Sequence, residues 1–197
     1  NLGYDVNYKP LPWKRCLSLA KDGEYDGIAT ASYKDKRAEF LNYPKDASTA
    51  KKSTQRVLQV EYVVVTVAES GYEYSGDVKT IPTPVRVPRG YSIGDDLKKQ
   101  GLKVDDGAAG DENNIKKMLR RGNGSVVTLP QIVELLTKQD AYKGKLHVSA
   151  QPVKSKSYYF PFSKSGKIAA ADQEKIWSEI ANVRNDLEFM GKMSAKY

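Results

Sequence analysis

Apolar and polar residues follow two different periods in the first thirty positions of the chain. Every second residue from Tyr4 to Tyr8 is apolar or aromatic, which predicts a strand. Between Trp13 and Ala20 the apolar residues recur every three or four positions, which predicts a helix with one apolar face. Gly23 ends this helix, and residues 25–30 follow as a short strand. The order strand, helix, strand predicts a βαβ unit and therefore a parallel sheet flanked by helices.

The middle of the chain starts with one long β-branched run and then alternates short strands with helices. Residues 57–68 form a strand longer than the usual five or six residues, long enough to pass from one lobe into another. The expected strands after it are residues 80–88 (interrupted by prolines), 103–105, 125–129, 145–153 and 156–164. The expected helices are residues 92–100, 111–121, 131–138, 172–184 and 187–196. This order is typical of an α/β protein.

Composition limits the classes of partner. The net charge of +8 raises nucleic acid or an acidic surface as a partner. However, the lysines are scattered among acidic residues and no basic run exceeds a pair, which favours a solvated basic surface over a nucleic-acid site. No run of about 18 apolar residues exists, so no membrane span is predicted. No basic, apolar leader opens the sequence, so we expect the protein either to be cytosolic or to have had an export signal removed.

Metal and covalent chemistry have little support in the sequence. Cys16 is the only cysteine, so it cannot form an internal disulfide, and we expect it to be a small core residue. A nucleophilic cysteine would need a histidine partner, and the only histidine, His147, lies in a strand-like stretch. One Cys and one His cannot build a metal cluster on their own, although carboxylate sites stay open. We expect no metal and no cofactor.

The end of the strand at residues 25–30 is the most informative short stretch. Two hydroxyl residues, Thr30 and Ser32, stand there at alternate positions, and Arg37 comes five residues after Ser32. Proteins with α/β folds bind ligands at the carboxyl ends of strands. Taken alone, Arg37 also fits a surface arginine paired with a neighbouring acid, Asp35 or Glu39.

The residues around Arg37 belong to a longer pattern. The stretch "LPWKRCLSLAKDGEYDGIATASYKDKRAEFLNYP" has an aromatic residue at a helix start, Gly-x-x-Asp-Gly before a strand, a small polar mouth and then an arginine. Three further stretches, "RGYSIGDDL", "NNIKKMLRRGN" and "KSKSYYFPFSK", follow in the second half. Together they cover nearly the whole chain, and they resemble the bacterial extracellular solute-binding proteins of family 3, the receptors that feed amino-acid ABC transporters.

The resemblance implies an α/β, two-lobed, type II periplasmic-binding-protein fold, in which the lobes close over a ligand. Lobe one would be residues 1–59 and 154–197, and lobe two would be residues 60–153. The strand that begins at Val57 would contain the first crossing between the lobes. The family starts with a strand and a helix ahead of the point where this sequence begins. We therefore expect an N-terminal strand and helix to be missing.

The resemblance also implies ligand contacts in lobe one. Arg37 matches the arginine that binds the ligand carboxylate, and a guanidinium offers two parallel N–H bonds to such a group. Thr30 and Ser32 match the positions that line the mouth of the strand. Trp13 matches an aromatic residue that stacks on the ligand side chain, and a core position on the apolar face of its helix is the alternative.

In lobe two the resemblance is incomplete. Ser92 matches a hydroxyl at a helix start that holds the carboxylate, with Tyr91 beside it, and an ordinary N-cap is the alternative for Ser92. The family's amino-acid receptors place an Asp for the ligand ammonium where this chain has Pro130. Thr128 lies two residues earlier and Glu134 one turn later. The sequence therefore predicts another small carboxylate as ligand, or Glu134 as the substitute acid.

These observations predict a receptor rather than an enzyme. We expect a monomer outside the cytoplasm, its signal peptide removed, that binds a small carboxylate-bearing ligand and delivers it to a membrane ABC permease. One alternative is an enzyme on the same fold, of the dehydratase or lyase type, for which Glu134 is the candidate acid or base. The other is the sensory ligand-binding domain of a membrane receptor.

Overall fold

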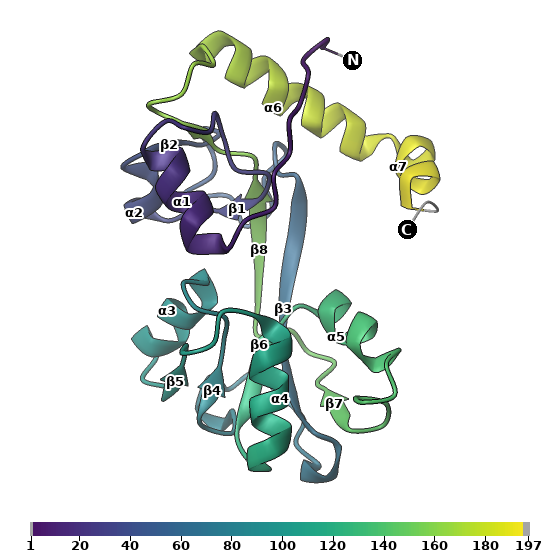
Figure 1. Cartoon of the computed structure of the whole chain (residues 1–197). Helices are drawn as coiled ribbons and strands as arrows, with labels where there is room; N and C mark the ends of the chain where they lie inside the picture. Colours follow the sequence, from purple (N-terminus) through teal and green to yellow (C-terminus); the bar gives the residue numbers. More distant parts are fainter. Residues whose placement is uncertain (1, 195–197) are drawn as a thin grey trace. The chain divides into compact units, whose positions relative to one another are not determined.

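The chain folds into two compact units, described here for residues 2–194 of a computed structural model (Figure 1). Unit 1 consists of the chain up to Gln59 and from Lys156 onwards, and unit 2 of Val60–Ser155. The chain leaves unit 1 in β3 (Leu58–Val67) and returns to it in β8 (Lys154–Tyr159). The long strand predicted at residues 57–68 is thus confirmed as an element that belongs to both units.

Unit 1 combines short antiparallel strand pairs with helices from both ends of the chain. Its elements besides β8 are α1 (Trp13–Lys21), β1 (Ala31–Ser32), α2 (Asp35–Ala38), β2 (Leu41–Asn42), β9 (Phe162–Ser163), α6 (Ala170–Asn185) and α7 (Leu187–Ser194). β1 pairs with β8 and β2 pairs with β9, both antiparallel. The last two residues of the helix predicted at 187–196 lie outside the described part of the chain.

The parallel βαβ unit predicted at the start of the chain does not form. Residues 2–11 are outside any helix or strand, and among residues 2–194 no strand pairs with the alternating stretch Tyr4–Tyr8. The strand predicted at 25–30 is reduced to a single bridge between Gly27 and Phe162. Alternation predicts which residues face one way, but a strand also needs a partner to satisfy its backbone groups.

The core of unit 1 confirms the apolar face of α1. Ala20 is fully buried and packs with Ile28, Ala31 and Leu41. On α6, Trp177 is buried, and its indole N–H donates to the Phe160 carbonyl at 2.7 Å. The two parts of the chain meet at Ala20, whose carbonyl accepts from the Ser163 hydroxyl at 2.5 Å.

Unit 2 has a mixed sheet with a regular α/β order. Its strands besides β3 are β4 (Val85–Arg86), β5 (Val104–Asp105), β6 (Ser125–Thr128) and β7 (Leu146–Val148). β4 lies between β5 and β6 and is parallel to both, while β3 is antiparallel to β6 and β7. Its helices are α3 (Ser92–Lys99), α4 (Asp111–Arg121) and α5 (Pro130–Thr137), with 3-10 turns η1 (Ala68–Ser70) and η2 (Val78–Thr80). The helices predicted in this region are confirmed.

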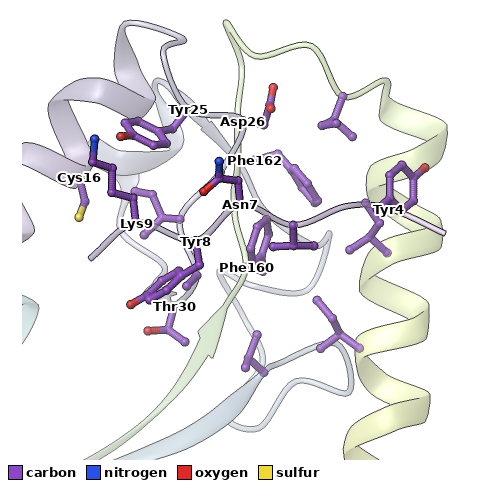
Figure 2. Close-up of a pocket in the computed structure, with 18 of the residues that line it drawn as sticks. Tyr4, Asn7, Tyr8, Lys9, Cys16, Tyr25, Asp26, Thr30, Phe160 and Phe162 are labelled. Carbon is purple, nitrogen blue, oxygen red and sulfur yellow. The ribbon is translucent and has the colours of Figure 1, made fainter. Parts of the chain in front are cut away.

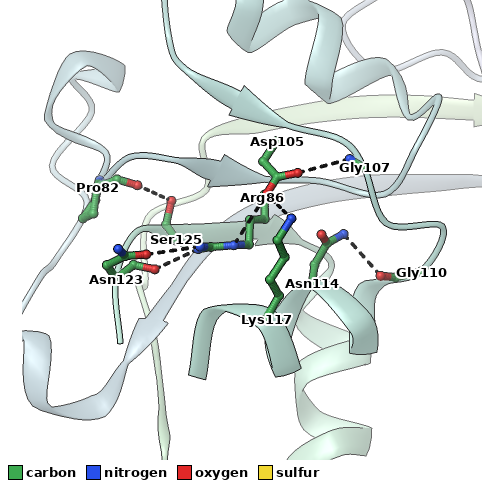
Figure 3. A network of polar contacts seen from close by, with 9 residues as sticks. All are labelled: Pro82, Arg86, Asp105, Gly107, Gly110, Asn114, Lys117, Asn123 and Ser125. Atoms are coloured by element: carbon green, nitrogen blue, oxygen red, sulfur yellow. Dashed lines mark hydrogen bonds and ion pairs between the residues drawn. The ribbon is translucent and has the colours of Figure 1, made fainter. Parts of the chain in front are cut away.

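A hydrophobic core and a buried polar network hold α4 against the sheet of unit 2. Ile115 and Met118 on α4 are fully buried in the core, as the helical spacing predicts. Beside them the Arg86 side chain, 2% exposed, donates from Nη1 to the Asn123 carbonyl at 2.8 Å (Figure 3). Asp105 accepts from Lys117 Nζ at 2.6 Å and lies 3.9 Å from Arg86 Nε.

No helix among residues 2–194 is both long and apolar enough to cross a membrane.

Candidate ligand-binding residues in the two units

Arg37 lies in a buried polar cluster of unit 1. Its side chain is 6% exposed, and Nη1 donates to the Ser32 carbonyl at 3.0 Å and to Ser32 Oγ at 3.1 Å. The guanidinium carbon lies 4.9 Å from the centroid of the Trp13 ring, a cation–π arrangement. The single-turn helix α2 begins three residues after β1 ends, so Arg37 folds back onto the last residue of that strand. Two other residues predicted for the site, Trp13 and Ser32, therefore both contact Arg37.

Tyr43 belongs to the same cluster, although the sequence analysis did not select it. Its hydroxyl donates to the Ser32 carbonyl at 3.1 Å, and its ring meets those of Tyr33 and Tyr159 edge to face. Burial raises the pKa of the Tyr43 phenol, and the nearby Arg37 charge opposes only part of that rise. The phenol is therefore neutral at physiological pH. The one sequence feature that could have pointed to Tyr43 is that it is an aromatic residue directly after β2.

A cavity of about 1120 Å³ lies beside this cluster within unit 1 (Figure 2). Trp13 and Thr30 both line it, with Tyr4 and Tyr8 from the N-terminal segment. Its apolar lining also includes Phe160, Phe162, Ile176, Ile180 and Val183. Cys16 lines it too, with Sγ 3.4 Å from the Leu11 carbonyl oxygen. Its side chain is only half-buried, so it is not the small core residue that we expected.

In unit 2 the predicted residues lie where the parallel strands end. Tyr91 occupies the N-cap position of α3, and Ser92 is the first residue of the helix. The N-cap is therefore one residue earlier than the sequence predicted. Ser92 is 1% exposed. Both residues follow β4, and their backbone groups are at a helix N-terminus, a position that favours anions.

Thr128 and Glu134 differ sharply in their surroundings. Thr128, the last residue of β6, is 1% exposed and its hydroxyl donates to the Asp111 carboxylate. The Glu134 side chain is 73% exposed on α5 and forms an ion pair with Lys138 at 4.0 Å. The carboxylate that contacts Thr128 is thus that of Asp111 and not that of Glu134. Burial raises the pKa of Asp111, and the bond from Thr128 opposes that rise.

Asp111 is the residue that the sequence analysis missed in this unit. It is the first residue of α4 and follows Gly110, a position where acids are common for the helix dipole alone. Because Asp111 lies 17 residues before Thr128, no local sequence pattern indicates the hydrogen bond between them.

The described residues contain no cluster of potential metal ligands. Among residues 2–194 no group of three or more His, Cys, Asp or Glu side chains is placed to hold a metal ion. His147 on β7 instead lies 2.7 Å from Glu73, whose other carboxylate oxygen accepts from the Ala150 amide. These contacts fasten the loop around Glu73 to the end of β7.

Comparison with known proteins identifies the fold. No protein-family profile and no curated protein sequence matches the chain. Among solved structures, a histidine kinase sensor domain with similarity to periplasmic binding proteins matches with a TM-score of 0.75 at 14% identity, over 98% of this chain and 79% of that one. The GluR0 ligand-binding core from Nostoc punctiforme, in complex with L-glutamate, matches with a TM-score of 0.70 at 12% identity, over 96% and 82%. The arginine-, lysine-, histidine-binding protein ArtJ from Geobacillus stearothermophilus matches with 0.69 at 17% identity, over 95% and 76%.

These similarities establish the fold of the chain. The chain has the two-lobed α/β fold of type II periplasmic binding proteins, as the resemblance implied. At identities of 12–17% the likeness extends to the fold and not to a ligand. The similar structures named here are ligand-binding or sensor proteins.

Proposed function

We propose that this chain is an extracytoplasmic solute-binding receptor of the family-3 type, which captures a small carboxylate-bearing ligand for an ABC importer. The observation that carries the proposal is the buried Arg37 guanidinium, held by Ser32 and stacked on Trp13. A guanidinium that is already held in place loses little further entropy when it binds an anion. The proposed activity is binding rather than catalysis.

In this proposal unit 1 supplies the principal contacts. Arg37 binds the ligand carboxylate, Thr30 and Ser32 add polar contacts, and Trp13 stacks on the ligand side chain. Charge-assisted hydrogen bonds contribute roughly 1.5–3 kcal/mol each, so a few of them with apolar burial suffice for about micromolar affinity. Tyr91, Ser92 and Thr128 are the residues of unit 2 that the proposal assigns to ligand binding. A ligand can favour one conformation of the protein only through contacts that are stronger in that conformation than in the other.

The test is ligand-dependent thermal stabilisation with an amino-acid panel. Solved structures with this fold contain bound glutamate, glutamine, lysine or arginine, so these four amino acids are the first probes. A ligand that binds only the folded state raises the melting temperature as its concentration rises. We expect at least one probe, or a related small carboxylate, to do so with the wild-type protein.

Arg37→Ala should abolish this stabilisation while the fold persists, because the carboxylate loses its cation. Arg37→Lys should retain part of it, since an ammonium keeps the charge but not the planar fork. Lys36→Ala is the matched control: it removes one positive charge from the exposed side of α2. If Arg37→Ala responded to ligand like the wild type, with circular dichroism showing intact folding, the proposed role would be refuted.

A second candidate is the sensory domain of a membrane receptor, favoured by the likeness to a histidine kinase sensor domain. Both candidates place the chain outside the cytoplasmic membrane and give the same ligand binding. They differ in the protein that recognises the ligand-bound form. Ligand-stimulated ATP hydrolysis by a reconstituted permease supports the receptor, which we expect to act as a monomer with a permease as its partner.

A further inference from the structure

Two arginines of unit 1 lie beside each other, where α6 ends and where the chain enters β3. Arg184, in the last turn of α6, donates from Nη1 to the Arg56 carbonyl at 2.5 Å and from Nη2 to Asn185 Oδ1 at 3.1 Å. Arg56 donates from Nη1 to the Ser53 carbonyl at 2.5 Å. Both arginines are half-buried. All of these acceptors are neutral oxygen atoms, so the contacts leave both positive charges uncompensated.

No acid of the described chain pairs with either arginine. Among residues 2–194 no Asp or Glu oxygen lies within 4.0 Å of the Arg56 or Arg184 guanidinium nitrogens. Asp186, two residues after Arg184, instead accepts from the Phe189 amide at 2.9 Å. Burial lowers the pKa of Arg184, and the charge of Arg56 lowers it further. Two like charges therefore lie close together in a partly desolvated place, an arrangement that an anion stabilises.

Two buried hydrogen-bond donors of the same cluster have no acceptor. Arg56 Nε and the hydroxyl of Tyr159 are buried and have no hydrogen-bond partner in the described residues, and Tyr159 is only 1% exposed. Burial raises the pKa of Tyr159, and the charges of Asp46 and Arg56 act on it in opposite directions, so these groups are neighbours. Asp46 itself accepts from the Ser53 hydroxyl at 2.9 Å. Because a guanidinium N–H can only donate, what this place lacks is an acceptor.

The position of Arg184 in its helix explains only part of this arrangement. A cation in the last turn of a helix is favoured by the helix dipole, which accounts for Arg184 alone. It accounts neither for Arg56 nor for the two donors without acceptors. A water molecule would accept their hydrogen bonds but would leave the two positive charges unbalanced, whereas an anion supplies both the acceptor and the charge. Arg184 and Val57 also line the cavity of unit 1, which gives an ion a route to the pair.

We propose that Arg56 and Arg184 bind a small inorganic anion such as chloride, with the Tyr159 hydroxyl as a further donor. The bound anion connects the end of α6 to the segment that leads into β3, and so stabilises unit 1. This site is separate from Arg37, whose guanidinium is held by Ser32 and lies against Trp13. The inference goes beyond the proposed function and does not depend on it.

The experiment measures thermal unfolding of the full chain as chloride replaces isethionate, a larger anion, at constant ionic strength. The variants at the site are Arg56→Gln, Arg184→Gln and Tyr159→Phe. Lys175→Gln is the matched control, because it removes a positive charge from an exposed position of α6, where Lys175 pairs with Asp172. Circular dichroism establishes folding of each variant. Crystals of the wild type grown in bromide locate the ion by its anomalous scattering, a measurement that does not depend on any variant folding.

We expect the wild-type melting temperature to rise by about 3–5 °C for each tenfold increase in chloride above the dissociation constant, because the anion binds only the folded state. Arg56→Gln and Arg184→Gln should abolish this rise, and Lys175→Gln should retain it. Tyr159→Phe should require several-fold more chloride, since one neutral donor is lost. The bromide peak should lie within hydrogen-bond distance of both guanidinium groups.

Other outcomes overturn the inference. A wild-type melting temperature that is the same in chloride and isethionate, with no bromide peak beside Arg56 and Arg184, would show that water satisfies the two donors. A chloride response that survives in Arg184→Gln but is lost in Arg37→Ala would place the anion at Arg37. In that case the inference is wrong, and the proposed function is unaffected.

Discussion

At the scale of single residues, close approach of the backbone decides which positions tolerate a side chain. Gly124 precedes β6 with φ +71°, and a Cβ there would meet the Pro84 carbonyl oxygen and lie 2.8 Å from Arg86 Nη1. Gly122 ends α4 with φ +63°, but a Cβ there meets nothing within 4 Å. The two glycines share the left-handed conformation and differ only in what surrounds them.

We therefore expect Gly124→Ala to destabilise unit 2 by roughly 2–4 kcal/mol, from backbone strain together with the displaced Arg86 network. Gly122→Ala should cost only about 1 kcal/mol, the strain alone. Urea unfolding monitored by circular dichroism measures both. Equal costs for the two variants would contradict the close approach at Gly124.

At the scale of elements, a charged network fastens α4 to the sheet through Asp105. The hydrogen bond from Lys117 holds the pKa of Asp105 below its usual value, while burial acts in the opposite direction. A lowered pKa in the folded state means that the charged form stabilises folding. This contribution is complete above the ordinary Asp pKa of about 4 and is lost as the pH falls through the lower folded-state pKa.

Asp105→Asn should accordingly reduce the free energy of unfolding at pH 7 by roughly 1–3 kcal/mol, because Lys117 and Arg86 lose their acid. The difference from the wild type should shrink as the pH is lowered below about 4. Asp106→Asn is the matched control: its pair with Lys98 at 2.9 Å is solvent-exposed, so we expect a loss of about 0.5 kcal/mol. A difference that stayed constant from pH 7 to pH 3 would contradict the role of the Asp105 charge.

At the scale of the whole molecule, the two units differ in how the chain builds them. Unit 2 is one continuous stretch, Val60–Ser155, with its own core around Ile115 and Met118. Its two ends are held together, because the Val153 amide donates to the Tyr62 carbonyl at 2.7 Å. Unit 1 is assembled from two pieces, one from the beginning and one from the end of the chain.

We expect residues 60–155 expressed alone to fold and to unfold cooperatively on heating, because the fragment keeps its core and its end-to-end contact. Circular dichroism melting and dispersed amide NMR signals measure this. Ile115→Ala in the fragment should lower its stability by about 2–5 kcal/mol, the cost of a cavity in a packed core. A fragment without cooperative unfolding would show that unit 2 depends on unit 1.

The sequence by itself determined the elements whose signal is local. Helical spacing located α4 from Asp111 to Arg121 with Ile115 and Met118 inward, and β-branched residues located β3. Such patterns depend on neighbours a few positions away, which the sequence displays directly. The resemblance added Arg37 and Trp13, which the fold brings into contact.

Only the tertiary structure decided the pairings between distant segments. The alternation at Tyr4–Tyr8 produced no strand, because no strand of the described chain lies beside it to accept its hydrogen bonds. Asp111 became the partner of Thr128, and Tyr43 the neighbour of Ser32, through the paths of the loops that carry them. Side-chain partners and counter-charges depend on where the chain returns in space, and sequence periodicity contains no such information.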